Sequence, residues 1–242
     1  MSAPVKTPNS HPRIQTYPIV EIFGPVIQGE GAMIGRQTHF VRLGGCDYRC
    51  TWCDTLYAVL PDQVRANSAR MSDEDVVERL RSLGTVTPWV TLSGGNPALH
   101  VLDSLVAALH AAGYRVAVET QGSIYRSWLE TCDLVTVSPK PPSSGMETDL
   151  RALDRFVGLP GAKLKVVVFD DADFAFGRSI HRRYPDVPFY LQVGNEVGAD
   201  ATDALLQKLD WLSRRTLADP ELGEAVVLPQ LHVLLYGNRR GV

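Results

Sequence analysis

Short apolar runs recur along the chain, and most of them are nearly continuous rather than alternating with polar residues. A continuous run such as Lys165–Phe169 suits a strand that is covered on both faces, as the strands of parallel sheets are. Runs of this kind predict six strands, at Thr38–Leu43, Trp89–Ser93, Arg115–Thr120, Leu134–Ser138, Leu164–Val168 and Phe189–Val193.

Between the predicted strands, apolar residues are spaced as on one face of a helix. The clearest such segment begins at the capping signal Ser72–Asp75 and stops at Gly84, residue types that typically begin and end helices. Similar spacing predicts helices at Leu102–Leu109, Leu150–Phe156 and Leu205–Leu212. Strands that alternate with helices form βα units around a parallel sheet. Since the six predicted strands are too few for a closed eight-stranded barrel, we predict an α/β fold with a partial (β/α)6 barrel.

Composition places the chain among soluble globular proteins, with 45% hydrophobic and 21% charged residues in a length of 242. Residues 1–18 contain four prolines and no apolar signal-peptide core, so we predict a flexible tail at 1–18 and a single domain at 19–242. No run approaches the roughly 20 apolar residues of a membrane span. The net charge of −3 comes without a basic stripe. We therefore expect a cytoplasmic protein that binds neither membranes nor nucleic acid.

Polar, glycine or cysteine residues follow five of the predicted strands, at Gly44–Asp54, Gly94–Pro97, Gln121–Gly122, Ser138–Lys140 and Gly194–Asn195. In parallel α/β folds the chemistry gathers at the carboxyl ends of the strands. These segments are therefore the first candidates for a functional site.

Three of the four cysteines fall in the segment Cys46-Asp-Tyr-Arg-Cys50-Thr-Trp-Cys53. Thiolates so closely spaced on one loop can converge on a soft metal centre. Structural zinc sites and electron-transfer iron–sulfur clusters normally take four ligands, but no histidine stands within a few residues of Cys53. Three thiolates would leave one iron of a cluster open to bind a substrate. The alternative is a zinc site completed by a distant histidine, in a binding module without catalysis. Cys132 stands apart in apolar surroundings and is expected in the core.

The spacing Cys-x3-Cys-x2-Cys, with the aromatic Trp52 before the third cysteine, resembles the motif of the radical S-adenosylmethionine (SAM) superfamily. Leu92–Pro97 is similar to that superfamily's Gly-Gly-Glu-Pro turn, which contacts the SAM amino group. The resemblance implies a [4Fe-4S] cluster on Cys46, Cys50 and Cys53, with SAM bound to its open iron. It also implies cofactor contacts at Trp52, Asp54, Gly95, Asn96, Ser138, Pro139, Lys140, Gln192, Val193, Gly194 and Asn195.

One position departs from the superfamily pattern. Asn96 stands where the turn usually has a glutamate. An amide oxygen still accepts a hydrogen bond from an ammonium group, but without the charge assistance of a carboxylate. We therefore expect a weaker contact to SAM at Asn96, or a larger share for backbone carbonyls.

Four further segments, Glu21–Gly31, Phe40–Cys46, Cys53–Ala58 and Leu228–His232, resemble the 7-carboxy-7-deazaguanine synthase family. The likeness runs from about Glu21 to the C-terminus. It implies a lyase that converts 6-carboxy-5,6,7,8-tetrahydropterin to 7-carboxy-7-deazaguanine with loss of ammonia, in queuosine and 7-deazapurine biosynthesis. It also implies that SAM is regenerated in each turnover, that Mg2+ is required, that a flavodoxin or ferredoxin reduces the cluster, and that the protein is a homodimer.

The same likeness assigns residues to the substrate. The implied pterin contacts are Ile27, Gln28, Gly29, Glu30, Arg42 and Ser93, and the implied Mg2+ ligand is Thr55. These roles suit the side chains, because a buried pterin needs paired donors and acceptors, an arginine grips a carboxylate with two nitrogens, and Mg2+ prefers oxygen ligands. His232 and Glu119 are further candidate site residues without an assigned role. His232 could equally be a histidine with a purely structural role.

A second enzyme class shares the cysteine motif and a similarly short chain. Glycyl-radical activating enzymes act on a protein and do not need the Gln28–Gly31 or Cys53–Thr55 segments. Those two segments are the feature that favours a pterin-converting enzyme over an activating enzyme.

Overall fold

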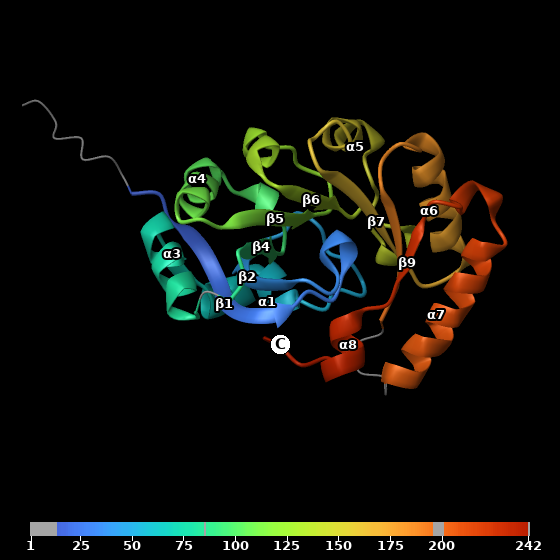
Figure 1. Cartoon of the computed structure of the whole chain (residues 1–242), viewed down its shortest axis with the longest axis horizontal. Coiled ribbons are helices and arrows are strands. Elements are labelled where there is room, and N and C mark those ends of the chain that lie inside the picture. The colour runs from blue at the N-terminus through green and yellow to red at the C-terminus, as the bar shows by residue number, and fades with distance from the viewer. Residues whose placement is uncertain (1–13, 85, 196–200, 242) are drawn as a thin grey trace, which may run out of the picture.

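The computed structural model describes residues 14–84, 86–195 and 201–241. Its centre is a single open sheet of nine strands in the order β3-β1-β2-β4-β5-β6-β7-β8-β9 (Figure 1). From β2 to β9, neighbouring strands pair in parallel, whereas β1 is antiparallel to both β2 and β3. The strands are β1 Tyr17–Ile27, β2 Gln37–Leu43, β3 Ala69–Met71, β4 Trp89–Gly94, β5 Arg115–Thr120, β6 Leu134–Val137, β7 Ala162–Val168, β8 Phe189–Val193 and β9 Val226–Leu228.

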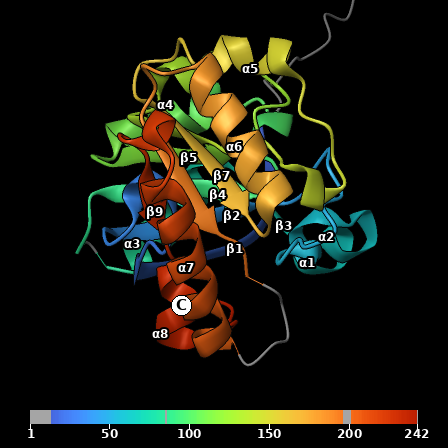
Figure 2. The same cartoon turned by 90° about the vertical axis from the view of Figure 1, so that its right-hand side faces the viewer.

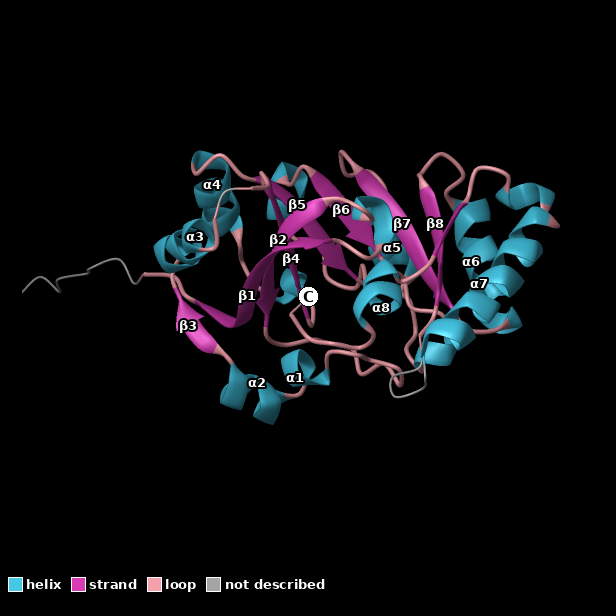
Figure 3. Cartoon of the chain, turned by 60° about the horizontal axis from the view of Figure 1, so that its bottom comes forward, coloured by secondary structure: helices cyan, strands magenta, loops and turns pink. Residues whose placement is uncertain are grey.

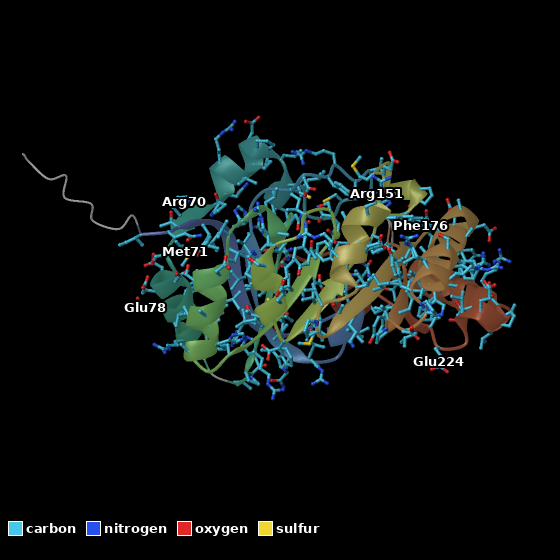
Figure 4. All side chains as sticks on the ribbon, turned by 90° about the horizontal axis from the view of Figure 1, so that it is seen from above. Arg70, Met71, Glu78, Arg151, Phe176 and Glu224 are labelled. Carbon is cyan, nitrogen blue, oxygen red and sulfur yellow. The ribbon has the colours of Figure 1, made fainter. Side chains whose placement is uncertain are left out.

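All six predicted strands are present, as β2 and β4 to β8. The strands that the sequence analysis missed are β1, β3 and β9, which lie toward the two ends of the sheet. Arg70 and Met71 of β3 lie toward one end of the molecule and Glu224, just before β9, toward the other (Figure 4). The α/β prediction and the open, partial barrel are confirmed.

Strand β1 escaped prediction because prolines normally argue against a strand. It contains Pro18 and Pro25, and its pairing with β2 is broken by register shifts near Glu21 and between Phe23 and Val26. Such bulges are places where a sheet tolerates proline. Pro25 lies within the second of these shifts. Pro18, predicted as part of the tail, lies instead near the start of β1, where it pairs with Arg70 of β3, and it belongs to the sheet together with the buried Tyr17. Residues 1–13 of that tail lie outside the described residues.

Most of the helices lie around the outside of the curved sheet (Figure 1). The helices are α1 Leu56–Val59, α2 Pro61–Asn67, α3 Asp73–Ser82, α4 Asp103–Ala111, α5 Leu150–Phe156, α6 Asp171–Arg183, α7 Ala201–Leu217 and α8 Leu231–Tyr236. The helices α6 and α7 cover the end of the sheet that carries β7 to β9 (Figure 2). At the start of α3, the Ser72 hydroxyl accepts a hydrogen bond from the Asp75 backbone, completing the predicted cap.

Apolar side chains fill the space between the sheet and the outer helices. Leu80 of α3 and Leu105 of α4 are fully buried there against the strands. This packing fixes the strands, and with them the loops that leave their carboxyl ends. Among the described residues, no helix is long and apolar enough to cross a membrane.

Candidate active site

One cavity of about 340 Å³ opens at the carboxyl ends of the parallel strands. Its lining includes residues from each of the five segments that were predicted to carry the site, among them Cys46, Gly95, Gln121, Lys140 and Asn195. The C-terminal segment that follows α8 also reaches it, between α8 and α1 (Figure 3). Residues that are far apart in the sequence therefore meet in one place.

The first part of the lining, here called the thiol wall, consists of Cys46, Cys50, Trp52, Cys53 and Thr55. All three thiols are free and only partly exposed. Burial raises the pKa values of Cys46 and Cys50. The Thr55 hydroxyl lies 3.7 Å from the Cys53 sulfur. Both chemical types of ligand that the sequence predicted, thiol and hydroxyl, thus share one loop.

The loop that carries the thiol wall is held by the segment after β6. The Thr51 hydroxyl donates to the backbone carbonyl of Ser143 at 2.6 Å, and the Trp52 ring nitrogen donates to the Ser143 hydroxyl at 3.0 Å. The Tyr48 hydroxyl donates to the backbone carbonyl of Glu147 at 2.7 Å. These bonds fix the loop without involving any of the three thiols.

Trp52 also packs against Phe169, with 5.2 Å between the ring centroids. The Lys140 ammonium lies 5.6 Å from the centre of the Trp52 ring and 3.4 Å from the Ser138 hydroxyl. Burial lowers the pKa of Lys140, and the thiol of Cys50 acts in the opposite direction. A cation and an aromatic ring therefore lie beside the cysteines, at the carboxyl end of β6.

The glycine turn after β4 presses its backbone against the cysteine loop. A side chain at Gly95 would lie 2.1 Å from the carbonyl oxygen of Gly45, and Gly94 has a φ of +139°. The Asn96 backbone N–H donates to the same Gly45 carbonyl at 2.8 Å. Only glycine permits this close approach. The turn thereby brings the end of β4 into contact with the segment that leads to Cys46.

The second part of the lining, here called the ionic wall, consists of Gln28, Glu30, Glu119, Lys165 and Gln230. The Lys165 ammonium lies 2.6 Å from one Glu30 oxygen, and the Gln230 amide donates to the other oxygen at 2.8 Å. Lys165 is only 4% exposed. Burial alone would raise the pKa of Glu30, but the positive charge of Lys165 holds it well below its usual range. Glu30 is therefore an ionised, clamped carboxylate.

Gln28 and Glu119 complete the ionic wall. The Gln28 amide nitrogen donates to a Glu119 oxygen at 3.0 Å, and its oxygen accepts from the backbone N–H of Gly29 at 2.7 Å. Burial raises the pKa of Glu119, against the opposing charge of Lys165. A side chain on Gly29 would meet the His232 ring at 2.2 Å. The Gln28–Glu30 loop is thus clamped between β5, β7 and the start of α8.

Arg42 stands beside the ionic wall on β2. Its Nε donates to Glu21 at 2.6 Å, and the guanidinium lies 5.9 Å from the centres of both the Phe23 and Tyr57 rings. Glu21 also receives the Tyr57 hydroxyl at 3.0 Å and Arg240 at 2.7 Å. Glu21 and the two rings therefore hold Arg42 as a cation at the cavity.

Several buried polar atoms have no partner among the described residues. They include the Ser93 hydroxyl, the Gln192 amide nitrogen and the Gln230 amide oxygen. Buried polar groups are normally hydrogen-bonded. Ser93 and Gln230 line the cavity, so their free atoms are available to a bound molecule.

Most of the predicted site residues line the cavity. The lining includes Ile27, Gln28, Gly29, Glu30, Arg42, Cys46, Cys50, Trp52, Cys53, Asp54, Thr55, Ser93, Gly95, Ser138, Lys140, Asn195 and His232. Five predicted cofactor contacts do not reach the lining of this cavity: Asn96, Pro139, Gln192, Val193 and Gly194. Asn96 is fully buried, and the Gln192 oxygen accepts from the Gly31 backbone N–H at 3.3 Å. These two side chains support neighbouring loops.

Sequence reasoning missed Lys165 and Gln230, and left Glu119 without a role. Lys165 carried a usable signal, because lysine is rarely buried unless it is paired, and here it interrupts the apolar run of β7. Gln230 carried no comparable signal. Its partner Glu30 is 200 residues away in the sequence, so only the fold reveals the pair.

Among the described residues, no three cysteine, histidine or acidic side chains converge as they would on a single metal ion. Cys132 is buried apart from the cavity, and its thiol donates to the Trp128 carbonyl at 3.6 Å. It is the core residue that the sequence predicted.

No protein-family model matches the chain. Over 238 residues it is 46% identical to the 7-carboxy-7-deazaguanine synthase of Bacillus cereus, covering 93% of this chain and 98% of that protein. It is 43% identical to the 7-carboxy-7-deazaguanine synthase of Bacillus subtilis, with the same two coverages. Among solved structures, QueE from Escherichia coli superposes with a TM-score of 0.66 at 26% identity, covering 90% of this chain and 95% of that one.

These relatives match over nearly the whole chain and bear the name of the enzyme family that the Gln28–Gly31 and Cys53–Thr55 segments resemble. A glycyl-radical activating enzyme and a zinc-stabilised binding module are therefore set aside. The chain belongs to the 7-carboxy-7-deazaguanine synthase family and is an enzyme.

Proposed function

We propose that this enzyme converts 6-carboxy-5,6,7,8-tetrahydropterin to 7-carboxy-7-deazaguanine with loss of ammonia, using a [4Fe-4S] cluster, SAM and Mg2+. The observation that carries the proposal is the sharing of one cavity by the thiol wall and the ionic wall. One wall offers ligands for a radical-generating cofactor, and the other offers fixed charges and hydrogen-bonding groups for a polar heterocycle. The product would enter queuosine and other 7-deazapurine pathways.

The residues of the thiol wall fit the cluster. Three partly exposed thiols on one braced loop supply three ligands, and no fourth thiol is near them. When bound, the cluster and SAM would supply a carbon-centred radical that removes a hydrogen atom from the substrate and returns one to the product. We propose that Cys46, Cys50 and Cys53 hold the cluster and that Trp52, packed on Phe169, shields it from water.

For SAM, we propose contacts around the ends of β4, β6 and β8. Gly95 offers backbone groups next to Cys46, and Ser138, Lys140 and Asn195 offer polar groups on the cavity. Asp54 lies on the same lining. In this arrangement Pro139, Gln192, Val193 and Gly194 shape the loops that carry these contacts.

For the pterin, we propose recognition by the ionic wall and Arg42. The terminal nitrogens of Arg42 would grip the substrate carboxylate, since its Nε is already engaged by Glu21 and a guanidinium binds carboxylates with two parallel bonds. Glu30, Gln28 and the unpaired Ser93 hydroxyl would pair the polar edge of the ring. Gly29 and Ile27 provide the close apolar and backbone surface, and His232 packs behind Gly29.

Mg2+ is proposed at Thr55. A threonine hydroxyl is a hard oxygen donor, and Mg2+ commonly combines one or two protein oxygens with oxygens of the substrate and water. Thr55 is on the cavity lining, so an ion held there would orient the substrate carboxylate. Its role would be that of a template and Lewis acid during the ring contraction.

We propose that the segment predicted as one domain, 19–242, is a single catalytic domain that also includes Tyr17 and Pro18 of β1. The proposal is supported by the cavity, which draws residues from β1 through to the C-terminal segment. A homodimer, reduction by flavodoxin or ferredoxin, and a cytoplasmic location are proposed on the family resemblance alone.

The test is product formation. The protein would be loaded with iron and sulfide under anaerobic conditions and supplied with SAM, a strong reductant, Mg2+ and 6-carboxytetrahydropterin. We expect 7-carboxy-7-deazaguanine, detected by mass and ultraviolet absorbance, and a lower rate when Mg2+ is chelated. Cleavage of SAM without this product would contradict the substrate, and absence of cleavage by a loaded, reduced enzyme would contradict the radical chemistry.

A further inference from the structure

We propose that Asn96 is a positioning residue that acts through Asp47 and Gln121 to hold the cysteine loop and an N–H group against the Cys46 sulfur. The proposal rests on the proposed function only in taking Cys46 as a cluster ligand. Its other part, the coupling between Asn96 and Asp47, concerns the protein without any cofactor.

The Asn96 side chain has no hydrogen-bonding capacity left for a ligand. Its oxygen accepts from the Ala98 backbone N–H at 3.1 Å and from the Thr120 hydroxyl at 2.9 Å. Its nitrogen donates to Asp47 at 2.9 Å and to the Ser123 hydroxyl at 3.3 Å. A primary amide has two donors and two acceptor positions, and here each has a partner. Asn96 is also 0% exposed, so it braces the site rather than touching the bound cofactor.

The bond to Asp47 extends the brace to the cluster loop. One oxygen of Asp47, Oδ1, accepts from the Asn96 nitrogen at 2.9 Å and also from the Gln121 nitrogen at 2.7 Å. The Gln121 nitrogen lies 3.6 Å from the Cys46 sulfur as well. Because Asp47 faces Gln121 with an acceptor, the Gln121 amide must present its nitrogen, rather than its oxygen, to Cys46.

This orientation has a consequence for a bound cluster. Hydrogen bonds to the sulfurs of an iron–sulfur cluster are among the features that set its reduction potential. An N–H directed at the Cys46 sulfur stabilises the extra negative charge of the reduced state. The Asn96–Asp47–Gln121 network therefore links the turn after β4 to the ease with which the cluster is reduced.

Exchanging the amide of Asn96 and the carboxylate of Asp47 separates the two proposed roles of the network. The first role is to hold the cysteine loop, and the second is to orient Gln121 toward Cys46. In Asn96→Asp, a carboxylate oxygen replaces the nitrogen that faces Asp47. A negative group that is fully buried at position 96 then meets the negative group of the exposed Asp47. In the double variant Asn96→Asp/Asp47→Asn, a donor at position 47 again meets an acceptor at position 96, and the net charge equals that of the natural protein. The amide at position 47, however, now presents a donor to Gln121, which must turn its oxygen toward it and its nitrogen away from Cys46.

The experiment compares four proteins: the natural chain, Asn96→Asp, Asp47→Asn and the double variant. Thermal unfolding is measured without cluster, and the midpoint potential is measured by a spectroscopic redox titration after cluster loading. We expect Asn96→Asp to unfold at a lower temperature and the double variant to recover most of that loss. Asp47→Asn retains an acceptor for both donors and should unfold near the natural protein.

The midpoint potential then tests whether the network orients the Gln121 N–H toward Cys46. We expect the double variant to have a lower potential than the natural protein despite its equal charge. Unfolding of Asn96→Asp at the natural temperature, or no recovery in the double variant, would overturn the coupling. Equal potentials in the double variant and the natural protein would overturn the role of Gln121. The product assay on the natural protein reports separately on the proposed function, since neither readout depends on the pterin.

Discussion

The two walls of the cavity are built in opposite ways. The thiol wall comes from one continuous loop, residues 46–55, and none of its three thiols is part of a disulfide. The ionic wall is assembled from side chains that are remote in sequence, with a separation of 135 positions from Glu30 to Lys165 and of 200 from Glu30 to Gln230. Its members are already paired with one another.

The difference indicates two kinds of preorganisation. In the proposed function, the thiol wall would bind an inorganic group that brings its own charge and bonds, so only the loop must be fixed. The ionic wall would recognise an organic molecule, and its charges are oriented in advance by each other. Losing a thiol should therefore remove the chemistry and spare the fold, whereas losing an ionic residue should damage both.

The largest effect is expected for Cys50→Ala. Removing one of the three proposed ligands should abolish product formation and lower the bound iron, while thermal unfolding of the cofactor-free protein stays nearly unchanged. Cys132→Ala is the matched control, because that thiol is buried away from the cavity. Iron and sulfide analysis with a product assay checks both. Full activity in Cys50→Ala would refute its place in the thiol wall.

The next effect is expected for Lys165→Met, which leaves the Glu30 carboxylate buried beside the cavity without its cation. Removing one partner of a buried ion pair typically costs about 3–5 kcal/mol of unfolding free energy. Chemical denaturation of the cofactor-free protein measures the loss, and Glu30→Gln/Lys165→Met should recover part of it. Arg214→Met, which breaks an exposed pair with Asp210, should leave the curve unchanged. Equal unfolding free energies for Lys165→Met and Arg214→Met would contradict the proposed role of the Glu30–Lys165 pair in the ionic wall.

The ionic wall also predicts a dependence of stability on pH. Because Lys165 holds the pKa of Glu30 below its unfolded value, the folded protein binds this proton less readily than the unfolded chain. The contribution of Glu30 is therefore present above about pH 4.3, the ordinary glutamate pKa, and is lost as the pH falls further. Unfolding free energies between pH 7 and pH 3 should fall less steeply in Glu30→Gln. An equal fall in unfolding free energy in the natural protein and in Glu30→Gln would contradict this prediction.

The smallest effect is expected for Trp52→Phe, which keeps an aromatic ring against Phe169 but removes the hydrogen bond to Ser143. Loss of one such bond costs about 1 kcal/mol. Ser143→Ala removes the same bond from the other side, so the double variant should lose little more than either single variant. Denaturation of the three proteins checks this, and fully additive losses would show that the bond does not brace the loop.

The sequence predicted those parts of the molecule whose signals are local. β5 and β8 lie at the residues expected, and the three thiols line one cavity. Strand β1 was missed because it contains two prolines, of which Pro25 is accommodated at a bulge opposite β2 and Pro18 near the start of the strand. The ionic wall and the full set of hydrogen bonds made by the Asn96 side chain could not be predicted from the sequence for a similar reason. Both depend on which side chains the fold brings within hydrogen-bond distance.

The most direct test of the account is a count of product molecules formed for each SAM molecule. The loaded enzyme would receive limiting SAM, with excess reductant, Mg2+ and 6-carboxytetrahydropterin. If the thiol wall holds a cluster that reuses SAM beside a pterin on the ionic wall, many molecules of 7-carboxy-7-deazaguanine should form for each SAM, without matching 5′-deoxyadenosine. One deoxyadenosine for every product, or no product at all, would contradict the account.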